Sequence, residues 1–86
     1  MKIYAVYYTE TGRLGVKNLG NFLKREEALA VFNRKAEEVR ADLVLGGFEY
    51  DEKRPSENDL MLGVIEPCDD EAYSEVIAIW ISKERL

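Results

Sequence analysis

The side chains that could carry chemistry in this 86-residue chain are mainly carboxylates. Four of them lie close together in the sequence, at Glu66, Asp69, Asp70 and Glu71. Such a group could bind Ca²⁺ or Mg²⁺, but these cations need several convergent oxygens, and the calcium-loop pattern with its central glycine is absent. We therefore interpret this stretch as a solvated acidic connection that opens a short helical turn, and we expect no metal site.

The groups that usually perform nucleophilic and acid–base catalysis are scarce. The chain contains no histidine and a single cysteine, Cys68. Histidine is the commonest general base and metal ligand, so the sequence excludes histidine-based triads and argues against zinc sites. The acidic surroundings of Cys68 disfavour its thiolate. The sequence therefore predicts a protein that is not an enzyme and that needs no cofactor.

Aromatic side chains recur in the apolar segments of the chain. The ones of interest are Tyr4, Tyr7, Tyr8, Tyr50 and Trp80. Sheet-based RNA readers stack bases on rings of this kind and surround them with lysine and arginine. Here the rings share their segments with aliphatic residues, and the second half of the chain is acidic. The pattern favours a hydrophobic core or a protein interface over a base-stacking platform.

Charge is distributed unevenly along the chain. The net charge is −5 overall, but residues 46–75 contain ten acidic and two basic side chains, a net of −8. Such a block repels phosphate backbones and attracts basic protein surfaces. We therefore predict no direct binding of nucleic acid, and a protein partner with a basic surface. The predicted contact residues are Glu49, Asp51, Glu52, Asp69, Asp70, Glu71 and Trp80.

One long helix, roughly Arg25 to Val44, is the element around which the rest is arranged. Apolar residues recur there at spacings of three and four, which places them on one stripe of a helix. That stripe is Leu29, Phe32, Ala36, Val39 and Leu43. The pair Gly46-Gly47 predicts a left-handed helix end.

The remaining apolar segments read as strands, because they are short and rich in β-branched and aromatic residues. They are Lys2–Glu10, a weaker Arg13–Leu19, Phe48–Glu52, Leu60–Glu66 and Glu75–Ser82. A turn at Thr11-Gly12 is expected to join the first two. Residues 51–59 contain no apolar side chain and one proline, so we expect a solvated loop there.

These elements predict a single α+β domain over residues 1–86, with a mostly antiparallel four- to five-stranded sheet and one long helix packed on one face. Three of the strands are apolar on both sides, yet one helix covers one face. The other face is then buried by a partner, most simply a second copy of the chain. The competing interpretation is that residues 13–22 or the long loops fold across it.

The sequence as a whole predicts a small, acidic, non-enzymatic protein-binding module. Its size and charge are typical of phage-encoded inhibitors of host defence, and such a module would occupy a basic, nucleic-acid-facing groove on its target. The alternative is a homodimeric ligand-binding or enzyme subunit with a pocket between two sheets. No apolar run is long enough to cross a membrane, and the lone cysteine forms no internal disulfide, so we expect a cytoplasmic protein without membrane contact.

Overall fold

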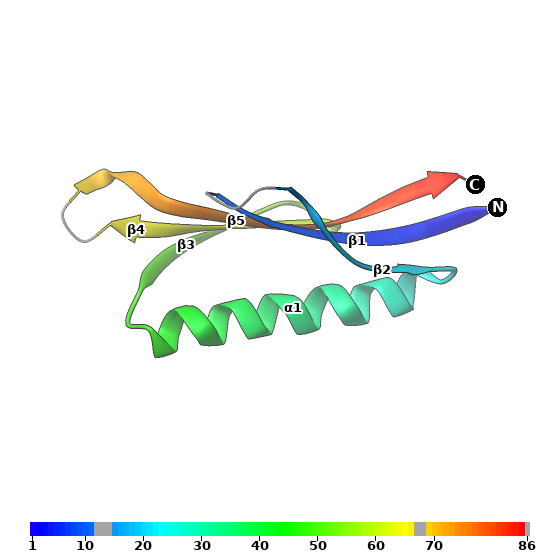
Figure 1. Ribbon diagram of the computed structural model, residues 1–86, viewed down its shortest axis with the longest axis horizontal. Helices are drawn as coiled ribbons and strands as arrows, with labels where there is room; N and C mark the ends of the chain where they lie inside the picture. Colours follow the sequence, from blue (N-terminus) through cyan, green and yellow to red (C-terminus); the bar gives the residue numbers. More distant parts are fainter. Residues whose placement is uncertain (12–14, 67–68, 86) are drawn as a thin grey trace.

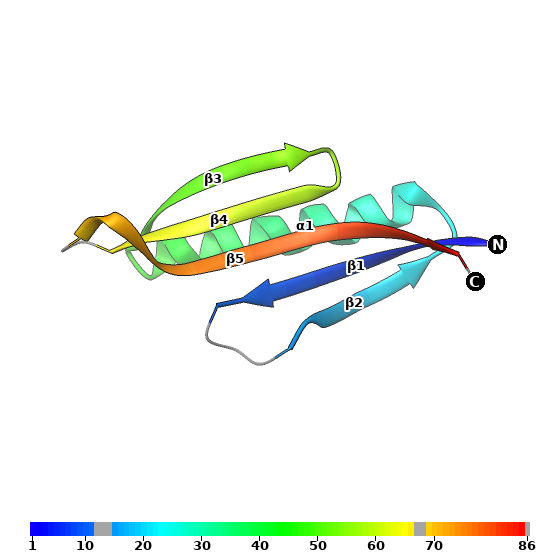
Figure 2. The ribbon, with the colours of Figure 1, turned by 90° about the horizontal axis from the view of Figure 1, so that it is seen from above.

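A five-stranded antiparallel sheet with one long helix beneath it forms the fold (Figures 1 and 2). This computed structural model describes residues 1–11, 15–66 and 69–85, and the side chains of these residues except 66 and 69–74. The strand order is β2-β1-β5-β4-β3. In chain order the elements are β1 (Lys2–Glu10), β2 (Lys17–Phe22), α1 (Arg25–Leu45), β3 (Glu49–Ser56), β4 (Asp59–Glu66) and β5 (Asp69–Arg85). The predicted α+β class is confirmed.

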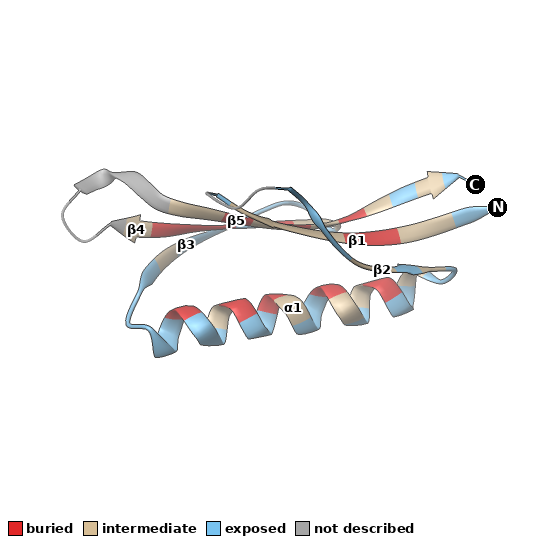
Figure 3. Ribbon diagram, viewed as in Figure 1, coloured by how far each residue is buried: buried red, intermediate tan, exposed pale blue. Residues whose placement is uncertain are grey.

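The helix α1 lies where its periodicity predicts, and its buried stripe faces the sheet (Figure 3). That stripe is Ala28, Phe32, Ala36, Val39 and Leu43. Ala28 takes the place predicted for Leu29, which is half-buried at the margin of the core. No side chain caps the N-terminus at Lys24, although Glu26 and Glu27 in the first turn suit the positive end of the helix dipole.

The C-terminal end of α1 is a Schellman motif. The amide of Phe48 donates to the carbonyl of Leu43 at 2.9 Å, and the amide of Gly47 donates to the carbonyl of Val44 at 3.1 Å. Gly47 has φ +74°, a left-handed conformation that costs residues with a Cβ about 1–2 kcal/mol. The Phe48 ring lies so close to Gly46 that a Cβ there would come within 2.7 Å of it. The predicted glycine-dependent helix end is therefore confirmed.

Replacing Gly47 with alanine is expected to lower the free energy of unfolding by about 1 kcal/mol, because alanine must adopt the left-handed conformation. Gly47→Asn is the matched control, since asparagine tolerates that conformation better, and it should lose less. Urea unfolding followed by circular dichroism measures both. Equal stability of Gly47→Ala and the native chain would show that this helix end does not depend on glycine.

The hydrophobic core lies between α1 and one face of the sheet and consists of two clusters. The first is built around Val6, Ala28, Phe32, Ala36, Leu60, Ile79 and Ile81. The second contains Val39, Leu43, Leu62, Val64 and Ile77. Side chains alternate between the two faces of a strand, so these buried residues show which face of each strand points towards the helix. The face that α1 covers carries Val6 and Ile79, and the opposite face carries Tyr7 and Trp80.

One stretch that we expected to be a loop lies mostly within a strand. The predicted strand Phe48–Glu52 begins one residue later than expected and continues to Ser56. Residues 49–56 form β3, which pairs with β4 through a tight connection at Glu57 and Asn58, so the predicted loop over 51–59 is wrong for most of its length. β3 is an edge strand whose side chains are almost all exposed, and Pro55 is compatible with such an edge. The prediction failed because charged residues suit a strand that water reaches from both sides.

The two other differences concern β5 and β2. β5 begins at Asp69, so the acidic stretch from residue 69 continues the strand where we expected a helical turn. β2 lies at Lys17–Phe22 and is displaced towards the C-terminus from the predicted Arg13–Leu19. The predicted Thr11-Gly12 turn falls partly outside the described residues, and Cys68 lies entirely outside them. Backbone pairing to a neighbouring strand outweighed local sequence preference in both places.

Candidate functional site: the uncovered face of the sheet

The face of the sheet opposite α1, which we call the open face, has no covering helix or strand among the described residues. Figure 1 shows the helix on one side of the sheet. Residues 17–22 form the edge strand β2, so these residues do not fold across the sheet. Residues 13–14 and 67–68, which the competing interpretation also includes, lie outside the described residues.

Strand register gathers apolar side chains at the centre of the open face. Tyr7 lies opposite Trp80, Thr9 lies opposite Ala78, and Met61 lies opposite Ala78 from the other side. Val76 continues the same face along β5. The apolar strip is therefore Tyr7, Met61, Val76, Ala78 and Trp80. Met61 is 39% exposed and the others are half-buried, so the strip is only partly shielded by its own neighbours.

Tyr7 and Trp80 form an aromatic contact on this face. Their ring centroids are 5.6 Å apart with an interplanar angle of 33°, within the range of favourable aromatic pairs. The Tyr7 hydroxyl donates a hydrogen bond of 2.6 Å to Oε1 of Glu84. This hydrogen bond is the main reason why the pKa of Tyr7 lies above its ordinary value, and desolvation acts in the same direction. The phenol therefore stays protonated and orients its ring beside Trp80.

The Tyr7→Phe variant is expected to show a pH-dependent loss of stability. The raised pKa of Tyr7 means that the folded state holds the phenolic proton more tightly than the unfolded state does. This contribution is fully present below the unfolded-state pKa of about 10 and is lost as pH rises through the folded-state pKa. Urea unfolding should therefore show the native chain to be more stable than Tyr7→Phe at pH 8, with the difference shrinking above pH 10. A constant difference up to pH 11 would contradict the Tyr7–Glu84 interaction.

Carboxylates surround the apolar strip. Strand alternation and register place four of them on the open face: Glu49, Asp51, Asp59 and Glu84. Lys53, opposite Met61, is the one basic side chain that register places there among the described strand residues. An apolar centre within a polar rim is the usual anatomy of a protein–protein interface. The negative charge of this rim favours a partner with a basic surface.

The predicted contact residues separate into three groups. Glu49, Asp51 and Trp80 share the open face. Glu52 points to the helix side, where its carboxylate accepts a 2.6 Å hydrogen bond from Nε of Arg40; this bond is the main reason why the pKa of Arg40 is raised. Glu52 is therefore not part of this face. The side chains of Asp69, Asp70 and Glu71 lie outside the description.

A small hollow interrupts the open face at Gly63. It measures about 60 Å³ and is bordered by Asp51, Lys53, Met61 and Val76. Gly63 is opposite Val76 on one side and Asp51 on the other, so the missing side chain leaves the depression. A small apolar group of a partner would fit into it.

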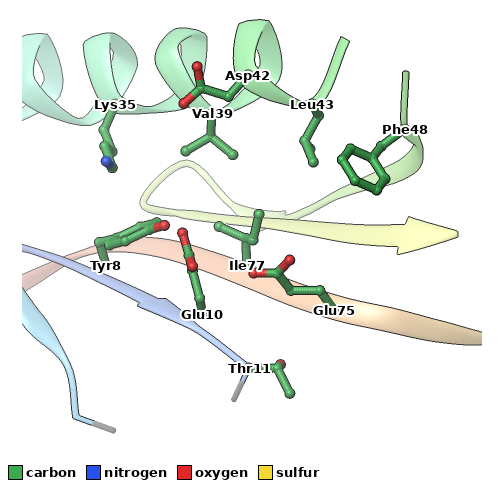
Figure 4. A pocket seen from close by; sticks show the side chains of 10 residues that line it. All are labelled: Tyr8, Glu10, Thr11, Lys35, Val39, Asp42, Leu43, Phe48, Glu75 and Ile77. Atoms are coloured by element: carbon green, nitrogen blue, oxygen red, sulfur yellow. The ribbon is translucent and has the colours of Figure 1, made fainter. Parts of the chain in front are cut away.

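A second, separate groove lies between the C-terminal half of α1, the C-terminal end of β1 and the middle of β5 (Figure 4). Its volume is about 480 Å³. Val39, Leu43 and Ile77 supply apolar surface to it, and Figure 4 shows Val39 and Leu43 pointing from the helix towards the sheet. Polar groups border it, among them Lys35, whose ammonium lies 4.4 Å from the centre of the Tyr8 ring. A groove of this size can hold a small ligand.

Among the described residues, no three cysteine, aspartate or glutamate side chains come together in a way that would hold a metal ion. The one described helix is also too polar to span a membrane. What these surfaces offer chemically is aromatic and aliphatic contact area bordered by charge.

The predicted contact residues did not include several members of the open face, among them Tyr7, Met61, Asp59 and Glu84. Alternation within each strand indicated that Tyr7 shares a face with Ile3 and Ala5. It gave no information on which residue of another strand lies beside it, because register is set by pairing over the whole sheet. The signal in the sequence that pointed to this face was a tyrosine and the sole tryptophan, each in a strand that is apolar on both faces.

Comparison of the chain with protein-family models, with curated proteins and with solved structures gives no match.

Proposed function

We propose that this protein is a non-enzymatic binding module whose open face docks onto a basic surface of another protein. The observation that carries the proposal is the uncovered sheet face, with its apolar strip at the centre and four carboxylates against one lysine around it. Aromatic residues and methionine are enriched in interface cores, and Trp80 lies at the middle of the central strand.

The dimensions of the face support this proposal. The molecule is 49 Å long and 22 Å wide, so one face is large enough for a standard interface, which buries about 800 Å² on each partner. Two copies of this chain pressed face to face would bring four carboxylates and one lysine against the same set. Such like-charge contact disfavours self-association, and a lysine- or arginine-rich surface is the better complement.

The finer proposal is that the module inhibits or regulates a target that handles nucleic acid. Such targets expose basic grooves to bind phosphate backbones, and an acidic module seated there competes with the nucleic acid. Size, net charge of −5 and the acidic rim support this proposal, together with the analogy to phage-encoded inhibitors of similar size and charge.

The first test is the molar mass in solution, measured by light scattering on a sizing column over a wide concentration range. A monomer is expected, because the acidic rim of the open face repels the same rim of a second copy and attracts a basic partner. A stable dimer that the Ala78→Arg change dissociates would show that a second copy occupies the face, and would overturn the proposed basic partner.

The second test inserts a cation into the centre of the open face. Ala78→Arg blocks the apolar strip and repels a basic partner, whereas Ala41→Arg places the same side chain at an exposed position of α1. Both variants and the native chain are used to isolate partners from a lysate of the source cells, and the binding of each purified partner is then measured. Loss of a basic partner with Ala78→Arg alone is expected. Equal binding by both variants would overturn the proposal.

A second candidate function, binding of a small ligand, is favoured by the groove of about 480 Å³ beside Lys35 and Tyr8. The predicted pocket lay between two sheets of a dimer, whereas this groove lies within one chain. A ligand raises the melting temperature in proportion to the logarithm of its concentration over Kd. A thermal-shift screen should then find a compound whose effect is reduced in Tyr8→Phe and kept in Tyr7→Phe. No such compound, or equal effects in both variants, would rule out this use of the groove.

A further inference from the structure

The Tyr7–Trp80 pair has charged neighbours of one sign. Asp59 lies directly opposite Trp80 in β4, on the same face, and directly opposed residues have Cβ atoms about 5 Å apart. The Ser56 hydroxyl donates a hydrogen bond to Oδ2 of Asp59, which orients the carboxylate. Beyond the Tyr7 ring, Glu84 holds the Tyr7 hydroxyl at 2.6 Å. Both carboxylates are thus kept in place by a hydroxyl donor.

Aromatic rings beside a carboxylate form a site for a cation. The face of an indole ring attracts cations more strongly than other rings do, and the attraction grows when the site is partly desolvated. Trp80 is half-buried, so its ring is partly shielded from water and is still accessible to a partner. The one basic side chain that register places on the described open face, Lys53, lies opposite Met61 on the edge strand β3. No basic side chain of this face is paired with Trp80 in the register.

We propose that Trp80 and Asp59 form a seat for an arginine side chain of the partner, with its guanidinium stacked on the Trp80 ring and hydrogen-bonded to the Asp59 carboxylate. Tyr7 is a positioning residue that supports the indole ring, and Glu84 orients Tyr7. This proposal rests on the proposed docking of a basic protein and names the group that anchors it. Arginine fits better than lysine, because its planar group stacks on rings, bonds carboxylates in a fixed geometry and is less strongly hydrated.

The seat can be tested without knowing the partner, because Trp80 is the only tryptophan of the chain and reports its own surroundings by fluorescence. The probes are three short capped peptides that differ at one central residue: arginine, lysine or citrulline. Citrulline has the shape of arginine without its charge. We expect a saturable change in Trp80 fluorescence with the arginine peptide in the millimolar range, a weaker response with lysine and none with citrulline.

Asp59→Asn is the informative variant, because asparagine keeps an oxygen that can accept the Ser56 hydrogen bond while losing the charge. It should weaken binding of the arginine peptide by about fivefold or more, as expected for loss of a charge-assisted hydrogen bond. Glu37→Gln is the matched control at an exposed position of α1, and it should leave the affinity within about twofold, because exposed charges at a distance are screened.

The outcomes separate this proposal from the proposed function. Equal responses to arginine and citrulline, no saturable response, or unchanged affinity in Asp59→Asn would overturn the arginine seat. If Ala78→Arg still abolished binding of a purified partner in that case, docking through the open face would stand with a different anchor. If the seat bound the arginine peptide while Ala78→Arg left partner binding intact, docking through the open face would be wrong and the seat would remain an isolated site.

Discussion

Replacing Phe32 with alanine is expected to lower the free energy of unfolding by about 3–5 kcal/mol, the range found for buried aromatic residues. The Phe32 side chain is fully buried and belongs to the cluster that joins α1 to the sheet. The ring is also capped from outside by the Arg54 guanidinium, 5.4 Å from its centre. Because small domains are stable by only about 5–15 kcal/mol, the loss should be visible as a large fall in the urea midpoint.

The control for this substitution is Leu45→Ala at the end of the same helix. Leu45 is 86% exposed, so its truncation should change stability by less than about 0.5 kcal/mol. Equilibrium urea unfolding followed by circular dichroism serves for both variants. A loss below about 1.5 kcal/mol for Phe32→Ala would contradict the packing of α1 against the sheet, because cavity formation in a rigid core costs more.

Replacing Trp80 with alanine is expected to weaken binding of the partner by about 30-fold or more, which is the roughly 2 kcal/mol typical of an interface hot spot. Tryptophan and tyrosine dominate such hot spots because they bury a large area with few rotatable bonds. Trp80 contacts Tyr7 and lies at the centre of the open face, where a docked surface excludes water most fully. Titration calorimetry with the partner purified in the lysate experiment measures the affinity.

Stability and affinity have to be separated for this variant, since Trp80 is half-buried and packs on Tyr7. Circular dichroism at the temperature of the titration shows whether the variant is folded. Val44→Ala is the matched control: Val44 is an apolar residue of α1 that is 67% exposed and lies off the buried stripe. It should bind with native affinity. If folded Trp80→Ala bound within about threefold of the native chain, the centre of the open face would not be an interface hot spot.

The helix was largely predictable from the sequence, because its determinants are local. Spacings of three and four residues defined a stripe, and glycines marked its end; both ends fall within one residue of the prediction. Ala28 is buried where the prediction had Leu29, so the buried side of the helix is rotated slightly about the helix axis from the predicted one. Contact with the sheet sets that rotation, and local spacing alone does not resolve it.

The strands were predictable only where they are apolar. β1 matches its predicted bounds and β4 begins one residue earlier than predicted, since runs of β-branched and aromatic residues favour a pleated, buried surface. The second half of β3 and the start of β5 are polar and acidic, and the sequence predicted connections there, whereas the first half of β3 lies in the predicted strand Phe48–Glu52. The polar segments become strands because β4 offers them backbone hydrogen bonds, a condition that no local window of sequence contains.

The candidate site shows the same division. Alternation along each strand determined that Tyr7 and Val6 face opposite ways, and that Trp80 shares a face with Val76 and Ala78. The count of one helix against two apolar faces determined that one face would lack a helical cover. The sequence did not determine which set would be buried, since both sets are apolar.

Tertiary structure decided the rest by choosing the pairing of strands and the face on which α1 packs. Packing on Val6 and Ile79 turned Tyr7 and Trp80 outwards, and the register of β1, β5 and β4 brought Tyr7, Trp80 and Asp59 side by side. Composition, charge, the helix and the periodicity of each apolar strand are local properties, and the sequence alone determined them. Register and face selection depend on contacts between residues far apart in the chain, so only the folded sheet fixes them.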